Sequence, residues 1–222
     1  MDLSEPGGKG DHGAYHTLVA VILSARTRDE QVLKLLPAFF KAFPNPEALA
    51  SATEVQVRSK INTIGMYKQK AKNIRAMAKR VVEEYNGKIP GTMEDLITLP
   101  GVGRKTASVV LVAVFGEPAI AVDTHVHRVT NRLGWVKTST PEKTEAALLK
   151  IIPKKLMRIV NRVFVKHGRY VCISKPRCWA CPLTDVCEFK NKNLERPKNV
   201  DEILQDIERR EGELQKLRRG VV

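Results

Sequence analysis

No stretch of the 222-residue chain is apolar for the ~20 residues that a helix needs to span a bilayer. Residues 1–13 are polar and glycine-rich, and they lack the apolar core of a secretion signal. We therefore expect a protein of a reducing intracellular compartment, either the cytoplasm and nucleoid or the nucleus of a eukaryote, with no membrane partner. The chain also lacks the period-two alternation typical of β-strands and any repeat of the solenoid type.

Acidic residues are scarce beside basic ones. Lys and Arg number 38 against 24 Asp and Glu, which gives a net charge of +14 and a pI near 9.8. Such an excess favours a polyanionic partner, most commonly a nucleic acid, over a basic protein with no anionic partner. Two predicted helices concentrate basic charge on one face, which could contact phosphate or only solvent. These residues are Lys68, Lys72, Arg75 and Lys79 on the first helix, and Arg158, Arg162, Lys166 and Arg169 on the second.

Apolar residues recur at helical spacing along most of the chain, and 43% of its residues are hydrophobic, which predicts a globular all-α fold. Loops rich in Pro, Gly and Asn separate helices expected over 46–52, 54–62 and 67–85. The segment 109–115 is apolar on every side, so we expect it to form a central, buried helix. After Arg196, an apolar stripe flanked by charges predicts a helix that packs on the protein or on a partner.

A turn with two glycines joins a short helix expected over 93–99 to a helix expected to start at Arg104. Gly101 and Gly103 can adopt positive φ and let the backbone approach a ligand closely. The N–H groups around Val102 and of the new helix would then point at a phosphate oxygen. This grip would position a nucleic acid without reading its sequence. The alternative interpretation is an ordinary corner between two helices.

Lys105 lies in the first turn of the helix that follows this hairpin. The positive end of the helix and partial burial disfavour a cation there, which favours the neutral, nucleophilic amine. Asp123 follows the apolar run 119–122, and it can cap a helix that begins at Thr124 as well as act in catalysis. A nearby carboxylate would favour the ammonium form instead, so the net effect stays open. The hairpin, the lysine and the aspartate together predict an enzyme that holds a DNA backbone and attacks a sugar carbon.

Cysteine is rare, and all four cysteines lie in one short segment. In a reducing compartment they are expected to bind a metal rather than to form disulfides. Four thiolates with one close pair suit tetrahedral zinc or a [4Fe–4S] cluster, and spacing alone does not choose between them. The residues are Cys172, Cys178, Cys181 and Cys187, spaced C-x5-C-x2-C-x5-C.

Two segments, 99–107 (LPGVGRKTA) and 121–126 (AVDTHV), resemble the helix–hairpin–helix and the catalytic loop of the endonuclease III family. The similarity continues through 23–25 (LSA), 63–67 (TIGMY) and 167–170 (HGRY), and it extends over most of the chain. The resemblance implies a base-excision DNA glycosylase that carries an iron–sulfur cluster. Its partner would be double-stranded DNA with damaged bases or abasic sites, and we expect it to act as a monomer.

The resemblance also implies a reaction. Lys105 would attack the C1′ carbon of the damaged nucleotide, and Asp123 would assist base departure and proton transfer. The resulting Schiff base would permit β-elimination, and the substrates would be oxidised or ring-damaged pyrimidines that are flipped out of the duplex. Related monofunctional glycosylases for adenine or mismatched thymine usually lack the lysine. A bifunctional glycosylase and AP lyase is therefore favoured over a monofunctional glycosylase or a non-catalytic DNA-binding protein.

The same resemblance implies two helical domains with a DNA-binding cleft between them. One domain would span 18–116, with six helices and the hairpin, and the other would combine 1–17 with 117–195 and hold the four-cysteine iron–sulfur site. Residues 196–222 would form a C-terminal helical tail. The residues expected to contact DNA are Gly101, Val102, Gly103, Arg26, Lys175 and Arg177.

Two positions depart from the family pattern. Many bacterial relatives have a glutamine after the LSA motif, which fills the gap left by the flipped base, whereas this chain has Arg26. The identity of the gap-filling residue and the lesion preference therefore stay open. Relatives also usually have six residues between the first two cysteines, where this chain has five. A loop can absorb that shortening, so a [4Fe–4S] cluster is expected in preference to zinc. Lys175 and Arg177 lie in this loop, where they would meet phosphate or remain solvated.

Overall fold

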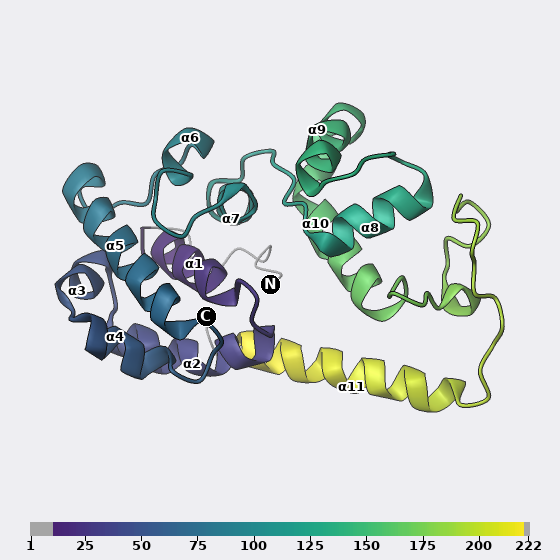
Figure 1. Ribbon diagram of the computed structural model, residues 1–222, viewed down its shortest axis with the longest axis horizontal. Coiled ribbons are helices and arrows are strands. Elements are labelled where there is room, and N and C mark those ends of the chain that lie inside the picture. Colours follow the sequence, from purple (N-terminus) through teal and green to yellow (C-terminus); the bar gives the residue numbers. More distant parts are fainter. Residues whose placement is uncertain (1–10, 220–222) are drawn as a thin grey trace. The chain divides into compact units, whose positions relative to one another are not determined.

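The computed structural model describes residues 11–219, and every regular element in that part of the chain is helical, as the periodicity predicts. The described residues divide into two compact units (Figure 1). Unit 1 comprises residues 11–117 and 212–219, and unit 2 comprises residues 118–211. None of the described helices is both long and apolar enough to cross a membrane.

The N-terminal segment belongs to a different unit from the one expected. The sequence groups residues 1–17 with the cysteine-containing domain, but the described part of that segment lies in unit 1. The physical reason is Tyr15, which is 1% exposed and whose hydroxyl donates to the carbonyl oxygen of Phe43 at 3.0 Å. Residues 1–10 and 220–222, which the expected domains also include, lie outside the described residues.

Unit 1 is built around its first helix. Every residue of 18–23 is buried, although its apolar spacing predicts only an amphipathic segment. The expected central helix, 109–115, is buried only in its first half: Phe115 is 38% exposed, so that prediction is wrong for the second half. The helical elements of unit 1 are α1 (Asp11–Ser24), α2 (Asp29–Ala42), α3 (Pro46–Ser51), α4 (Glu54–Ile61), α5 (Tyr67–Tyr85), α6 (Met93–Leu96), α7 (Arg104–Val110) and the π-helical η1 (Leu111–Phe115).

Local signals define the helices α3 to α5, whose bounds fall within one residue of the expected ones. Asn45 caps α3 by accepting a hydrogen bond from the Ala48 amide at 2.8 Å. Thr53 and Gln56 form a capping box at the start of α4. The apolar face of α5 is buried as predicted and packs on α1, α3 and α4. This long helix supports both loops of unit 1 that are discussed below.

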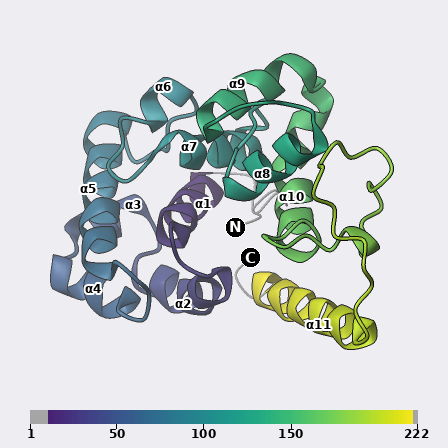
Figure 2. The same ribbon diagram turned by 45° about the vertical axis from the view of Figure 1, so that its right-hand side comes forward.

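Unit 2 contains α8 (Thr124–Leu133), α9 (Pro141–Ile151), α10 (Lys154–Tyr170), the short 3₁₀ turn η2 (Cys178–Ala180) and the part of α11 (Val200–Arg219) that ends at Glu211. Helices α8, α9 and α10 lie together (Figure 2). Their buried core includes Val126, Val129 and Phe164. Thr140 caps α9 with Pro141 at the first helical position, as expected.

Helix α11 forms an ion pair with one residue of the second basic stripe. Lys166 of α10 forms an ion pair with Glu211 at 2.5 Å, so this lysine contacts the tail helix within unit 2. The apolar stripe of α11 is covered unevenly, because Leu214 is 6% exposed and Leu204 is 42% exposed. The tail helix therefore buries part of its apolar stripe and leaves part of it exposed.

Candidate active site

The hairpin between α6 and α7 is a tight turn with one left-handed residue. The Val102 amide donates to the Leu99 carbonyl at 3.0 Å, and Gly101 has a φ of +83°. Gly103 instead has a φ of −97°, so only Gly101 uses the positive φ that both glycines can adopt. Val102 is buried, whereas both glycines are exposed. The turn therefore presents its backbone, not a large side chain, to the outside.

The two glycines serve different purposes. A Cβ atom on Gly101 would lie 2.9 Å from Cβ and 3.1 Å from Nδ2 of Asn73 on α5, and the positive φ already disfavours other residues. A Cβ atom on Gly103 would meet nothing within 4 Å. Gly101 is thus required by the fold, whereas Gly103 leaves open space beside the start of α7, where a ligand can approach the backbone.

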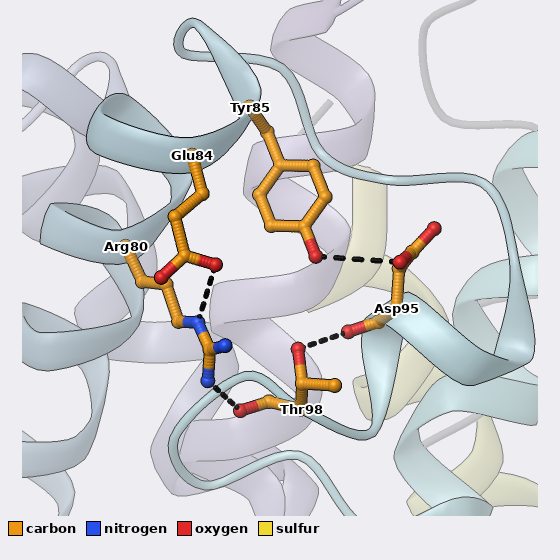
Figure 3. Close-up of polar contacts among 5 residues, drawn as sticks. All are labelled: Arg80, Glu84, Tyr85, Asp95 and Thr98. Carbon is orange, nitrogen blue, oxygen red and sulfur yellow. Dashed lines mark hydrogen bonds and ion pairs between the residues drawn. The ribbon is translucent and has the colours of Figure 1, made fainter.

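A polar network ties the hairpin to the end of α5 (Figure 3). The Arg80 guanidinium donates from Nε to Glu84 at 2.8 Å and from Nη1 to the carbonyl of Thr98, directly before the hairpin, at 2.7 Å. The Thr98 hydroxyl donates to the Asp95 carbonyl at 2.7 Å, and the Tyr85 hydroxyl donates to the Asp95 carboxylate at 3.4 Å. These bonds hold α6 and the entry to the turn against one face of α5.

Lys105 is the second residue of α7, and its side chain is exposed directly after the hairpin. The first turn of α7 contains no acidic residue. The amides of the first turn of a helix have no partner within the helix, so an anion bound there would lie close to this lysine. The observed helix start is the one that the sequence predicts.

Asp123 belongs to unit 2, where it is half-buried at the start of α8. One carboxylate oxygen, Oδ1, accepts from the amides of His125 and Val126, both at 2.9 Å. The preceding run is anchored as well, because the Asn161 side chain on α10 donates to the Ala121 carbonyl at 2.7 Å. Asp123 therefore has the helix-capping role that the sequence predicts, and its position is fixed from both sides.

All four cysteines line one small pocket in unit 2. Burial raises the pKa of the Cys181 thiol, and the neighbouring Cys172 and Cys178 add to the effect. Within the described residues, no three Cys, His, Asp or Glu side chains converge on the position of a single metal ion. The four cysteines therefore share one pocket and have the spacing of a cluster loop.

Arginines of α8 hold the cysteine loop in place. Arg132 donates to the carbonyls of Ile173 at 2.6 Å and Ser174 at 3.0 Å, and it lies 3.4 Å from the sulfur of Cys172. Arg128 donates to the Cys172 carbonyl at 3.0 Å. A guanidinium beside thiolate ligands would offset their negative charge.

The helices α8 and α10 meet where His125 packs on Gly168. A Cβ atom at position 168 would lie 2.9 Å from Cβ of His125, so only glycine fits this crossing. Burial lowers the pKa of His125, against the opposing effect of Asp123. The neighbouring guanidinium groups of Arg128 and Arg169 lower the pKa of His125 further.

The remaining expected contact residues differ in how available they are. Lys175 is exposed, whereas Arg177 is half-buried and donates from Nη1 to the carbonyl of Tyr170 at 2.7 Å. Arg26 is exposed in the loop between α1 and α2, and it has a φ of +53°. Left-handed backbone is rare for a residue with a side chain, so this loop is held in an unusual shape.

Several supporting residues were missed at the level of sequence: Lys70, Arg128, Arg132 and Asn161. All four donate to backbone carbonyls far away in the chain. Arg128 and Arg132 are four residues apart on one helix, and this spacing is only a weak sequence indication that they support the cysteine loop. Lys70 and Asn161 carry no signal in the local pattern.

Comparison with known proteins agrees with this architecture. Residues 19–154 match the HhH-GPD superfamily of base excision DNA repair proteins. The fold and the hairpin thus define a base excision DNA repair protein of that superfamily. Endonuclease III of Thermotoga maritima is 46% identical over 176 residues, which are 79% of this chain and 83% of that protein. Endonuclease III of Escherichia coli is 41% identical over 179 residues, 80% of this chain and 85% of that protein. The chain belongs to the endonuclease III family.

Solved structures show the same relationship. A trapped covalent intermediate of endonuclease III with DNA aligns with a TM-score of 0.77 and 37% identity, over 83% of this chain and 86% of that chain. A thermostable thymine-DNA glycosylase aligns with a TM-score of 0.73 and 26% identity, over 81% of this chain and 85% of that chain.

Proposed function

We propose that the chain is a DNA N-glycosylase and AP lyase that removes oxidised pyrimidines from double-stranded DNA. The observation that carries this proposal is Lys105, an exposed amine in the first helical turn after the hairpin, in a chain of the endonuclease III family. A covalent complex with DNA has been trapped for a related endonuclease III, which supports attack by an enzyme nucleophile.

In the proposed reaction, the Lys105 amine attacks C1′ of the flipped nucleotide and the bond from C1′ to the base breaks. The base leaves with the bonding pair and takes up a proton, and Asp123 assists its departure and the proton transfers. The nitrogen then loses one proton, and the C1′–O4′ bond breaks as O4′ takes up a proton, which opens the sugar ring to a protonated Schiff base. Loss of a C2′ proton then breaks the C3′–O bond, and water releases the lysine by hydrolysis.

The proposed DNA grip is electrostatic and mostly made by the backbone. The exposed turn Gly101–Gly103 and the first amides of α7 would hold a phosphate, helped by the helix dipole. Arg26 would lie at the gap left by the flipped base, and the exposed Lys175 would meet a further phosphate. Arg177 would contribute less to phosphate binding, because its guanidinium already binds the carbonyl of Tyr170.

Cys172, Cys178, Cys181 and Cys187 would hold a [4Fe–4S] cluster in preference to zinc. Their thiols line one pocket, and Arg132 supplies positive charge at Cys172. Such a cluster would fix the loop that presents Lys175. An iron and sulfide content near that of one cluster, with visible absorbance, is the expected result. A colourless protein with one zinc per chain would contradict this assignment.

Borohydride trapping on a duplex with a single abasic site tests the lysine. The wild-type protein is expected to form a covalent adduct, and Lys105→Ala is expected to form none. Lys60→Ala removes an exposed lysine of α4 and serves as the control that keeps the adduct. An adduct with Lys105→Ala as abundant as with the wild type would refute the assigned nucleophile.

A monofunctional glycosylase is the second candidate, because a thymine-DNA glycosylase shares the fold. A panel of single-lesion duplexes separates the two. Base release from oxidised pyrimidines together with strand cleavage supports the proposed function. Release of mismatched thymine without cleavage supports the alternative.

A further inference from the structure

Lys70 is a buried lysine that faces the loop of Arg26. It lies one turn into α5, and its residue is only 5% exposed. The ammonium donates to the carbonyl of Leu23 at 2.7 Å and to the hydroxyl of Thr27 at 2.5 Å. Leu23 and Thr27 stand on the two sides of Arg26, and they are 47 and 43 positions from the lysine. One side chain of α5 therefore spans both ends of the turn that presents Arg26.

Backbone hydrogen bonds close the turn locally, and one of them is long. The Ala25 amide donates to Ile22 at 3.3 Å, and the Thr27 amide donates to Ser24 at 3.1 Å. Arg26 has a φ of +53°, a conformation that residues with a side chain rarely adopt. Such a conformation persists where surrounding contacts over-determine it, and the Lys70 ammonium is a long-range contact that reaches this turn.

Burial of this lysine has a cost that apolar residues would not have. Desolvation lowers the pKa of Lys70 to about 8. A methionine or leucine would fill a buried position on this helix face without that penalty. A lysine is useful here because it can donate to two acceptors at once, and its apolar stem packs along α5.

We propose that Lys70 is a positioning residue that fixes the loop from Leu23 to Thr27, so that Arg26 is presented to DNA in one conformation. This inference rests on the proposed function for the part that concerns DNA. Lys70 touches no reacting atom; it acts through the backbone of the loop. The same helix holds the hairpin through Asn73 and Arg80. Helix α5 thus sets the spacing of two loops that contact the substrate within unit 1.

Three substitutions test the proposal. Lys70→Met keeps the length and the apolar stem but removes the donors, Thr27→Val removes one acceptor, and Arg26→Ala removes the presented side chain. The rate of single-turnover excision of an oxidised pyrimidine is expected to fall about 10- to 100-fold in Lys70→Met, because a small displacement of a positioning group costs about that much. Hydrogen exchange in a peptide covering residues 22–29 is expected to quicken. Lys60→Met, on the exposed face of α4, is the matched control for both measurements.

A double substitution separates positioning from general destabilisation. If Lys70 acts through Arg26, Lys70→Met is expected to slow Arg26→Ala little further, so the two effects are not additive. Additive effects, or a wild-type excision rate in Lys70→Met, would overturn the proposal. Should Lys70→Met fail to fold, Thr27→Val tests the same loop, and it is expected to show the smaller loss of one of the two bonds.

The design also separates failure of this proposal from failure of the proposed function. If the wild-type protein neither excises bases nor forms a borohydride adduct, the proposed function is wrong. The hydrogen-exchange measurement still tests whether the bonds of Lys70 fix the loop. Unchanged exchange at residues 22–29 in both Lys70→Met and Thr27→Val would overturn the positioning role on its own. Adduct formation on an abasic site reports Lys105 and is expected to be less affected than base excision.

Discussion

Asp123 combines a structural role with a proposed catalytic one, and two substitutions separate them. Asp123→Ala removes an oxygen that accepts from the amides of His125 and Val126 at 2.9 Å. Loss of an N-cap costs about 0.5–2 kcal/mol, and loss of a carboxylate at a helix start costs about 0.3–1 kcal/mol. Asp123→Asn keeps a capping oxygen and loses only the charge. We therefore expect Asp123→Ala to lose about 1–2 kcal/mol of unfolding free energy and Asp123→Asn less than about 1 kcal/mol.

The effect on the reaction follows a different order. General acid–base groups contribute about 10²- to 10⁴-fold, so both variants are expected to release the base about 10²- to 10⁴-fold more slowly in single turnover. Unfolding cannot produce that loss. A domain with about 5 kcal/mol of stability that loses about 2 kcal/mol is still more than 99% folded, by the tenfold change per ~1.4 kcal/mol.

The assay pairs urea denaturation, followed by circular dichroism, with single-turnover base release. Thr140→Ala is the matched control, because Thr140 caps the neighbouring α9 through the Lys143 amide and lies outside the proposed site. It is expected to lose about 1 kcal/mol and to keep its rate. A wild-type rate in Asp123→Asn would refute the catalytic role and leave Asp123 as a cap only. Equal destabilisation of Asp123→Asn and Asp123→Ala would refute the reasoning about the cap.

Three further outcomes are expected. Gly101→Ala should destabilise the protein by at least about 1 kcal/mol and weaken DNA binding, because the added Cβ would approach Asn73 at a position with positive φ. Gly103→Ala should fold normally, and equal melting temperatures of the two variants would contradict this. Lys70 has a pKa of about 8 instead of 10.5, so between these pH values the unfolded chain binds more protons than the folded one. The unfolding free energy of the wild type should therefore rise with pH across that window, by at most about 3 kcal/mol relative to Lys70→Met. If the unfolding free energies of the two proteins, measured by urea denaturation, change with pH in parallel, protonation of Lys70 is not linked to folding. Lys175→Ala should reduce the slope of log affinity against log salt by about 1 without changing lesion preference, and an unchanged slope would remove Lys175 from the phosphate contacts.

Features that depend on a few neighbouring residues could be predicted from the sequence. Thr140 with Pro141 marks the start of α9, and Asp123 marks the start of α8, because caps act on amides two or three residues away. The left-handed turn at Gly101 follows from the same kind of local rule. Gly103 did not need positive φ, since a single left-handed residue completes the turn.

Features that depend on distant contacts could not be predicted. The central position of α1 requires knowing which helices surround it, and its apolar spacing does not contain that information. Phe115, the last residue of η1, is exposed although its segment is uniformly apolar. Arg177 and Lys166 looked available in the sequence, yet one binds the carbonyl of Tyr170 and the other pairs with Glu211.

The supports around the proposed site share one kind of contact: a side chain on a helix donates to a backbone carbonyl of a loop. Lys70 and Arg80 do this in unit 1, and Arg128 and Arg132 do it in unit 2. A carbonyl is present whatever residue occupies the loop, so the loop can change its side chains and keep its shape. Arg26 illustrates this arrangement, because its side chain is exposed while the nearby Leu23 carbonyl accepts from Lys70. If Arg26 contacts DNA as proposed, its replacement should change lesion preference without a change in how the loop is held.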